Sequence, residues 1–246
     1  MKKPFLEIFK NKKPIFAMLH LKGDNPEEIF ERAKREFHIY LEEGVDAVIV
    51  ENYYGNYYDM ERILRYIDEN DFDIIVGINC LNVDPMGFEL GKRFHADFVQ
   101  LDSVAGHLKV RDDPAFAEFM KKMRSEFDGY VLGGVRFKYQ PYLSGRSLEE
   151  DLTIGMTRCD AIVVTQDATG QETSMEKINE FRSIMKDFPL VIGAGVTAEN
   201  CAEQFSVGDA AIVGSYFKDT YKDTGDVDAS HVRSMIEAVN KVRKEG

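Results

Sequence analysis

The sequence predicts an α/β protein, a (β/α)₈ TIM barrel that forms a single domain over residues 1–246. Three observations support this fold: eight short apolar runs recur, a polar turn and a helical pattern follow each run, and polar residues end nearly every run. An open doubly wound sheet could also hold eight parallel strands. The even number of strands and their polar ends favour the closed barrel.

The apolar runs are expected to be buried parallel strands, because they are short, apolar and bounded by turn residues. Parallel strands need crossover connections, and the helical patterns between the runs supply them. The expected strands are, in order, Ile15–His20, Ala47–Glu51, Ile74–Asn79, Phe98–Asp102, Tyr130–Lys138, Ala161–Thr165, Leu190–Gly193 and Ala211–Gly214.

Helix signals lie between the strands. Asn25 is a capping residue, Pro26 and two glutamates follow it, and apolar residues then recur with a period near that of a helix until Gly44 ends the pattern. Further helices are expected to begin at Ser174 and Thr197, to cover the barrel floor at Phe5–Phe9, and to close the chain over Val227–Val242.

Composition argues against several classes of protein. The net charge is −12 and no basic block offsets it, so binding to nucleic acid or to an anionic membrane is not expected. Cys80, Cys159 and Cys201 are scattered and contain no CxxC pair, which favours a reducing compartment over a disulfide framework. No apolar run has the length of a signal peptide core or a membrane span, so we expect a cytoplasmic protein without membrane insertion.

Glycine turns follow the last two expected strands. In this fold, function lies at the C-terminal ends of the strands, and the usual phosphate site follows strands seven and eight. Glycine lets backbone N–H groups approach a phosphate without a Cβ atom in the way. The turns could instead only permit tight connections. We expect a phosphate site at Gly193, Ala194, Gly195, Gly214 and Ser215.

Charged residues end other strands. Glu51 could act as a general base, or hold a divalent cation or a sugar hydroxyl. Lys138 could form a Schiff base, stabilise an enolate or bind an anion, and His20 could shuttle protons. A Glu51–Lys138 ion pair and a structural histidine are the alternatives. No motif with metal-ligand spacing is present, so we assign no metal ligand and no certain cofactor. Further ligand-binding candidates are Asn52, Asn79, Asp102, Thr165, Asp167, Thr169 and Gly170.

Short segments spread along nearly the whole chain resemble the BtpA/SgcQ family, and they occur in the same order as in that family. The resemblance implies a barrel of the phosphate-binding type. Some members are linked to photosystem I biogenesis and others to carbohydrate-utilisation gene regions. The chain differs from the family pattern at Tyr139, where a histidine is usual. The matching segments are Met18–Leu21, Gly44–Asp46, Val50–Asn52, Gly77–Leu81, Lys138, Val163–Thr165, Ala168–Gly170, Gly193–Thr197, Glu199–Asn200, Gly214–Ser215 and Phe217–Lys218.

The expected function is that of an enzyme acting on a phosphorylated sugar or related metabolite, by isomerase, aldolase or other lyase chemistry. Its partner would be a phosphorylated small molecule, and a homo-oligomer could form. One alternative is a non-catalytic biogenesis, assembly or ligand-sensing factor. A second alternative is an FMN-dependent oxidoreductase, since the same turns could hold a flavin phosphate.

Overall fold

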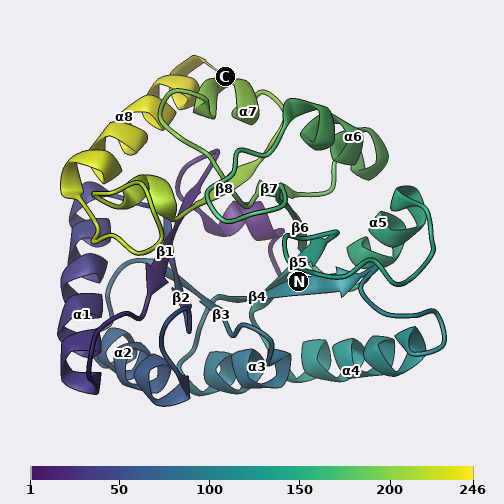
Figure 1. Ribbon diagram of the computed structural model, residues 1–246, viewed down its shortest axis with the longest axis horizontal. Helices are drawn as coiled ribbons and strands as arrows, with labels where there is room; N and C mark the ends of the chain where they lie inside the picture. Colours follow the sequence, from purple (N-terminus) through teal and green to yellow (C-terminus); the bar gives the residue numbers. More distant parts are fainter. Residues whose placement is uncertain (1, 246) are drawn as a thin grey trace.

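The computed structural model describes residues 2–245 and contains a closed barrel of eight parallel strands that pair in chain order. The predicted (β/α)₈ barrel is therefore confirmed. Helices form an outer ring around the strands (Figure 1). The strands are β1 (Ile15–His20), β2 (Ala47–Glu51), β3 (Ile75–Asn79), β4 (Phe98–Ala105), β5 (Tyr130–Val135), β6 (Ala161–Val164), β7 (Leu190–Ile192) and β8 (Ala210–Val213).

The predicted helix signals act as expected in the first crossover. The Asn25 side chain accepts a hydrogen bond from the Glu28 N–H at 3.0 Å, and Gly44 ends the helix in the left-handed conformation, at φ 79°. The α-helices are α1 (Pro26–Glu43), α2 (Tyr57–Asn70), α3 (Asp84–Arg93), α4 (Asp113–Glu126), α5 (Leu148–Met156), α6 (Met175–Met185), α7 (Cys201–Phe205) and α8 (Ala229–Glu245), and the 3₁₀ helices are η1 (Phe5–Ile8) and η2 (Ser215–Phe217).

Two helix predictions need correction. The helix expected from Thr197 begins at Cys201 instead, because the Asn200 side chain accepts the Thr197 N–H at 2.8 Å and holds this stretch as a turn. The closing helix begins at Ala229 rather than at residue 227. Among the described helices, none is both long enough and apolar enough to cross a membrane.

Several strand ends differ from the prediction by one residue, and two others differ by more. β5 ends at Val135 and not at Lys138, because Arg136 adopts a positive φ of 48° that an extended strand does not permit. β4 continues to Ala105, beyond Asp102, and its register against β5 shifts between Leu101 and Ala105. Lys138 therefore lies in the loop after β5 rather than on the strand.

An aromatic cluster closes the N-terminal end of the barrel. Phe5 of η1 is buried, and its ring packs at 6.1 Å from Phe16, 5.8 Å from Phe98 and 5.5 Å from Tyr130, measured between centroids. Phe16, Phe98 and Tyr130 lie at the N-terminal ends of β1, β4 and β5. The short helix that was expected at the barrel floor is thus confirmed, and the space inside the barrel opens at the opposite end.

Candidate functional site

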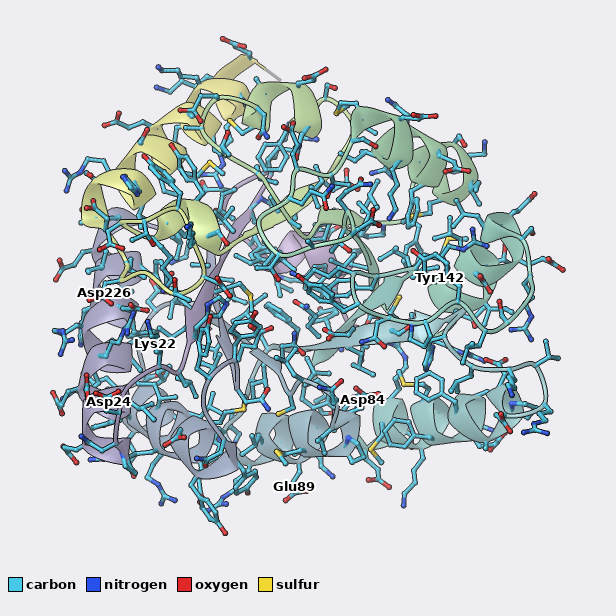
Figure 2. The ribbon with its side chains drawn as sticks, in the orientation of Figure 1. Lys22, Asp24, Asp84, Glu89, Tyr142 and Asp226 are labelled. Atoms are coloured by element: carbon cyan, nitrogen blue, oxygen red, sulfur yellow. The ribbon has the colours of Figure 1, made fainter. Side chains whose placement is uncertain are left out.

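A cavity of about 420 Å³ lies at the C-terminal ends of the strands, and every strand or the loop after it contributes to its wall. Loops surround this end of the barrel: Figure 2 shows Lys22 and Asp226 on the α1 side of the ring and Tyr142 on the α5 side, all three outside the cavity wall. The predicted site residues on this wall are His20, Glu51, Asn79, Asp102, Lys138, Thr169, Gly170, Gly193, Ala194, Gly195, Gly214 and Ser215.

Three predicted site residues do not reach the cavity wall. The Asn52 side chain accepts the Leu81 N–H at 2.7 Å, and the Thr165 hydroxyl accepts the Lys138 N–H at 2.8 Å. Both residues therefore position the backbone of neighbouring loops. Asp167 is exposed on the loop after β6 and lies outside the cavity.

Strand register assembles a row of buried polar groups. β1 and β2 pair His20 with Glu51, and β2 and β3 pair Glu51 with Asn79. The His20 Nε2 lies 3.2 Å from Glu51 Oε2, and the Asn79 Nδ2 donates to Glu51 Oε1 at 2.9 Å and to Asp102 Oδ1 at 3.2 Å. One amide nitrogen thus joins two carboxylates, which holds Glu51 and Asp102 close together.

The pKa of Asp102 is raised from 3.8 to about 6, chiefly by burial and then by the nearby charge of Glu51. The hydrogen bonds from Asn79 and Gln100 and the charge of Lys138 act in the opposite direction. A carboxyl group with such a pKa is mostly ionised at neutral pH, but it keeps a larger protonated fraction than an ordinary aspartate. Asp102 is therefore suited to give and to take a proton.

Lys138 reaches the cavity without an ion-pair partner among residues 2–245. The alternative of a Glu51–Lys138 ion pair is not formed, and β2 and β5 are three strands apart in the ring. The anchored backbone of Lys138 fixes where its side chain begins, while the ammonium group remains available to a ligand.

Unpaired backbone donors collect at the turns after β7 and β8. Within the part of the chain that the structure describes, the N–H groups of Ala194, Gly195, Gly214 and Ser215 donate to no protein acceptor. The Gly193 N–H bonds to the Val164 carbonyl at 2.7 Å, so Gly193 adds space rather than a donor. Unpaired backbone amides at one side of a cavity can bind an anion.

Gly195 has a strict structural requirement. Its φ is 72°, and a Cβ atom there would lie 2.2 Å from the Glu172 Cα. At Gly214, a Cβ atom would meet only Met18, at 3.5 Å, and His20 Cε1, at 3.8 Å. The first glycine is required by the backbone, whereas at the second a Cβ atom would make only ordinary van der Waals contacts.

The order of strands in the ring fixes how these groups face one another. In a closed barrel of eight strands, each strand lies opposite the fourth strand after it, so β7 and β8 face β3 and β4, and β1 faces β5. The backbone donors are thus opposite Asn79 and Asp102. His20 and Lys138 stand on the two sides between them.

Tyr53, Tyr139 and Tyr221 also line the cavity wall, and none of them is among the predicted site residues. Tyr53 packs against the His20 ring, with 4.9 Å between centroids. The Tyr139 hydroxyl accepts the Thr169 N–H at 2.9 Å, which ties the loops after β5 and β6 together. The tyrosine-rich stretch Tyr53–Tyr58 is the signal in the sequence that could have indicated Tyr53.

The described residues, 2–245, contain no group of three or more His, Cys, Asp or Glu side chains that could hold a metal ion.

Comparison with known proteins gives relatives that match nearly the whole chain. An uncharacterized protein of Methanocaldococcus jannaschii is 24% identical over 262 residues, which cover 97% of this chain and 99% of that protein. The photosystem I biogenesis protein BtpA of Synechocystis is 23% identical over 258 residues, which cover 95% and 90%.

Solved structures share the fold. A thiamine phosphate pyrophosphorylase from Pyrococcus furiosus superposes with a TM-score of 0.62 at 14% identity and covers 94% of this chain and 96% of its own. A phosphoribosyl anthranilate isomerase from Thermus thermophilus superposes with a TM-score of 0.64 at 13% identity, with coverages of 94% and 100%. At these identities the likeness shows the barrel alone.

The model of the BtpA family matches residues 11–241, which include all eight strands of the barrel. This match confirms the resemblance that the motifs indicate. The chain belongs to the BtpA family.

Proposed function

We propose that this protein is an enzyme that acts on a phosphorylated sugar or a related small phosphorylated metabolite, by isomerase or lyase chemistry. One observation carries the proposal: the free backbone donors after β7 and β8 line the same cavity as the charged groups Glu51, Asp102 and Lys138, and Asp102 lies on the wall opposite those donors. A ligand whose phosphate binds at the donors would extend its carbon chain toward the carboxylates.

The charged groups match the needs of proton transfer next to a carbonyl. Glu51 or Asp102 would take a proton from carbon, and Asp102 would return one, because its pKa of about 6 allows both protonation states. Lys138 would stabilise the negative charge that develops on oxygen, or form a Schiff base with the carbonyl. His20 bonds to Glu51 and would orient it.

Neighbouring structures are consistent with this proposal. The names of two of them, thiamine phosphate pyrophosphorylase and phosphoribosyl anthranilate isomerase, refer to phosphorylated compounds. Barrels of this fold often hold phosphate after strands seven and eight. The comparison supports the ligand class and leaves the reaction to experiment.

Thermal shift with inorganic phosphate and a panel of sugar phosphates tests the ligand class. Stabilisation by phosphate esters is expected, and no stabilisation by any of them, or by phosphate, would contradict the proposal. Once a substrate is found, Glu51→Gln and Lys138→Met should abolish turnover while the fold and phosphate binding remain. Asp187→Asn, on an exposed residue outside the cavity, is the control for the loss of a charge.

A non-catalytic role is the second candidate, and the name of the Synechocystis relative, a photosystem I biogenesis protein, favours it. In that case a phosphorylated ligand would bind without turnover and would change the affinity for a protein partner. Glu51→Gln and Lys138→Met would then alter ligand binding or partner binding, with no reaction to lose.

A further inference from the structure

Aromatic side chains surround the mouth of the cavity. Tyr53, Tyr139 and Tyr221 line it, and Tyr139 and Tyr221 expose 69% and 56% of their surface. Tyr139 is held in place by the hydrogen bond to its hydroxyl, and the Tyr221 ring stacks on His231 with 4.4 Å between centroids. These rings are thus fixed in position, while much of their apolar surface remains uncovered above the cavity.

The backbone at the mouth adopts an uncommon conformation. Tyr139 has a φ of 62°, Tyr221 of 55° and Asn82 of 64°, all in the left-handed region that disfavours side chains with a Cβ atom. Strain of this kind is typical of ligand-binding segments, where the surroundings hold the residue in place.

Free amide groups accompany the rings. The side chains of Asn82, after β3, and Gln140, after β5, line the same cavity, and neither forms a hydrogen bond with the described residues. An amide side chain offers both a donor and an acceptor. Paired donors and acceptors recognise the edge of a heteroaromatic ring, whereas an aromatic side chain stacks on its face.

The positions of these groups agree with one bound molecule. Asn82 follows β3, on the wall opposite the free N–H groups after β7, and Gln140 follows β5, on the side wall beyond β4. A molecule with its phosphate at those N–H groups and its sugar beside Asp102 would bring a third group to Tyr139, Asn82 and Gln140. A sugar phosphate alone has no third group to place there.

We propose that the ligand of this cavity is a phosphorylated sugar that carries a planar heteroaromatic ring, such as a nucleobase, and that Tyr139, Asn82 and Gln140 form the subsite for the ring. This proposal rests on the proposed phosphate site and names the class of ligand that the site accepts.

Isothermal titration with matched probes tests it. Adenosine 5′-monophosphate and uridine 5′-monophosphate are compared with ribose 5-phosphate, which lacks the ring, and with adenosine and uridine, which lack the phosphate. Stacking of a base on an aromatic side chain changes affinity by about tenfold or more. At least one nucleotide should therefore bind about tenfold more tightly than ribose 5-phosphate. Tyr139→Ser should remove that difference and leave the affinity for ribose 5-phosphate unchanged.

Tyr142→Ser is the control, because Tyr142 belongs to the same loop, is 58% exposed and does not line the cavity. It should alter no affinity. The ring subsite is overturned if ribose 5-phosphate binds as tightly as both nucleotides, if Tyr139→Ser weakens all phosphorylated probes equally, or if no probe binds. If a nucleoside binds as tightly as its nucleotide and depends on Tyr139, the ring subsite holds and the phosphate site fails.

Discussion

Replacing Asp102 by asparagine should stabilise the ligand-free protein near neutral pH. In the folded protein, the pKa of Asp102 is raised from 3.8 to about 6, chiefly by burial and then by the charge of Glu51. The unfolded chain releases the same proton at lower pH. Ionisation therefore favours unfolding, and the resulting loss of stability grows as pH rises from about 4 to about 6 and is then constant.

The magnitude follows from the difference between the two pKa values. A difference of about 2 units corresponds to about 3 kcal/mol at pH 7.5, and linkage leaves about 1 kcal/mol of it at pH 4.5. Asparagine carries no charge and still offers an oxygen to Asn79, so the variant should recover these amounts at most. The midpoint of thermal unfolding should rise by up to about 10 °C at pH 7.5.

Urea denaturation at pH 4.5 and pH 7.5 measures both free energies of unfolding. Asp187→Asn removes an equal charge from an exposed position and should show no such dependence on pH. An equal gain for Asp102→Asn at both pH values, or no gain at pH 7.5, would refute the electrostatic reasoning. Stabilisation at the expense of activity is expected of a functional carboxylate.

Three further outcomes are expected. Lys218 and Glu36 form a buried ion pair at 2.8 Å, so Lys218→Met should lower the free energy of unfolding by about 3 to 5 kcal/mol in urea denaturation. Adding Glu36→Gln should recover part of that loss, and an unchanged stability of Lys218→Met would contradict the prediction. Gly195→Ala should lower the melting temperature markedly, since its Cβ would lie 2.2 Å from Glu172 Cα, whereas Gly214→Ala should be tolerated; equal effects in thermal shift would argue against this distinction. Cys80, Cys159 and Cys201 are buried, and burial raises the pKa of Cys80 to about 12. A thiol reagent should therefore label the native protein slowly and the urea-unfolded protein quickly. Rapid labelling of the native protein would contradict the burial of these cysteines.

The fold could be predicted because its signals are local and repeated. Each buried strand is a short apolar run, and the register then brings the end of each strand beside the next, as with His20, Glu51 and Asn79. The end of β5 could not be predicted, because Val135 and Phe137 continue the apolar pattern past the turn at Arg136. Only the backbone conformation of Arg136 shows that the strand has ended.

The candidate site was predictable where polar residues end strands and less so in the loops. Thr165 and Asn52 have the polar character of ligand-binding residues, yet each satisfies a backbone N–H of a neighbouring loop. Such long-range hydrogen bonds leave no mark on sequence spacing. Tyr221 reaches the cavity from a loop seven residues after Gly214, where no periodic pattern exists to indicate its position.

The aromatic plug formed by η1 has a kinetic consequence. Because Phe5 packs against Phe16, Phe98 and Tyr130, the N-terminal end of the barrel is closed. A ligand in the cavity would therefore enter and leave through the opening at the C-terminal ends of the strands. A new ligand and a departing ligand would share this opening, so slow release of one would delay binding of the next. The loops around the opening would then limit the rate of ligand exchange, independently of any chemical step in the cavity.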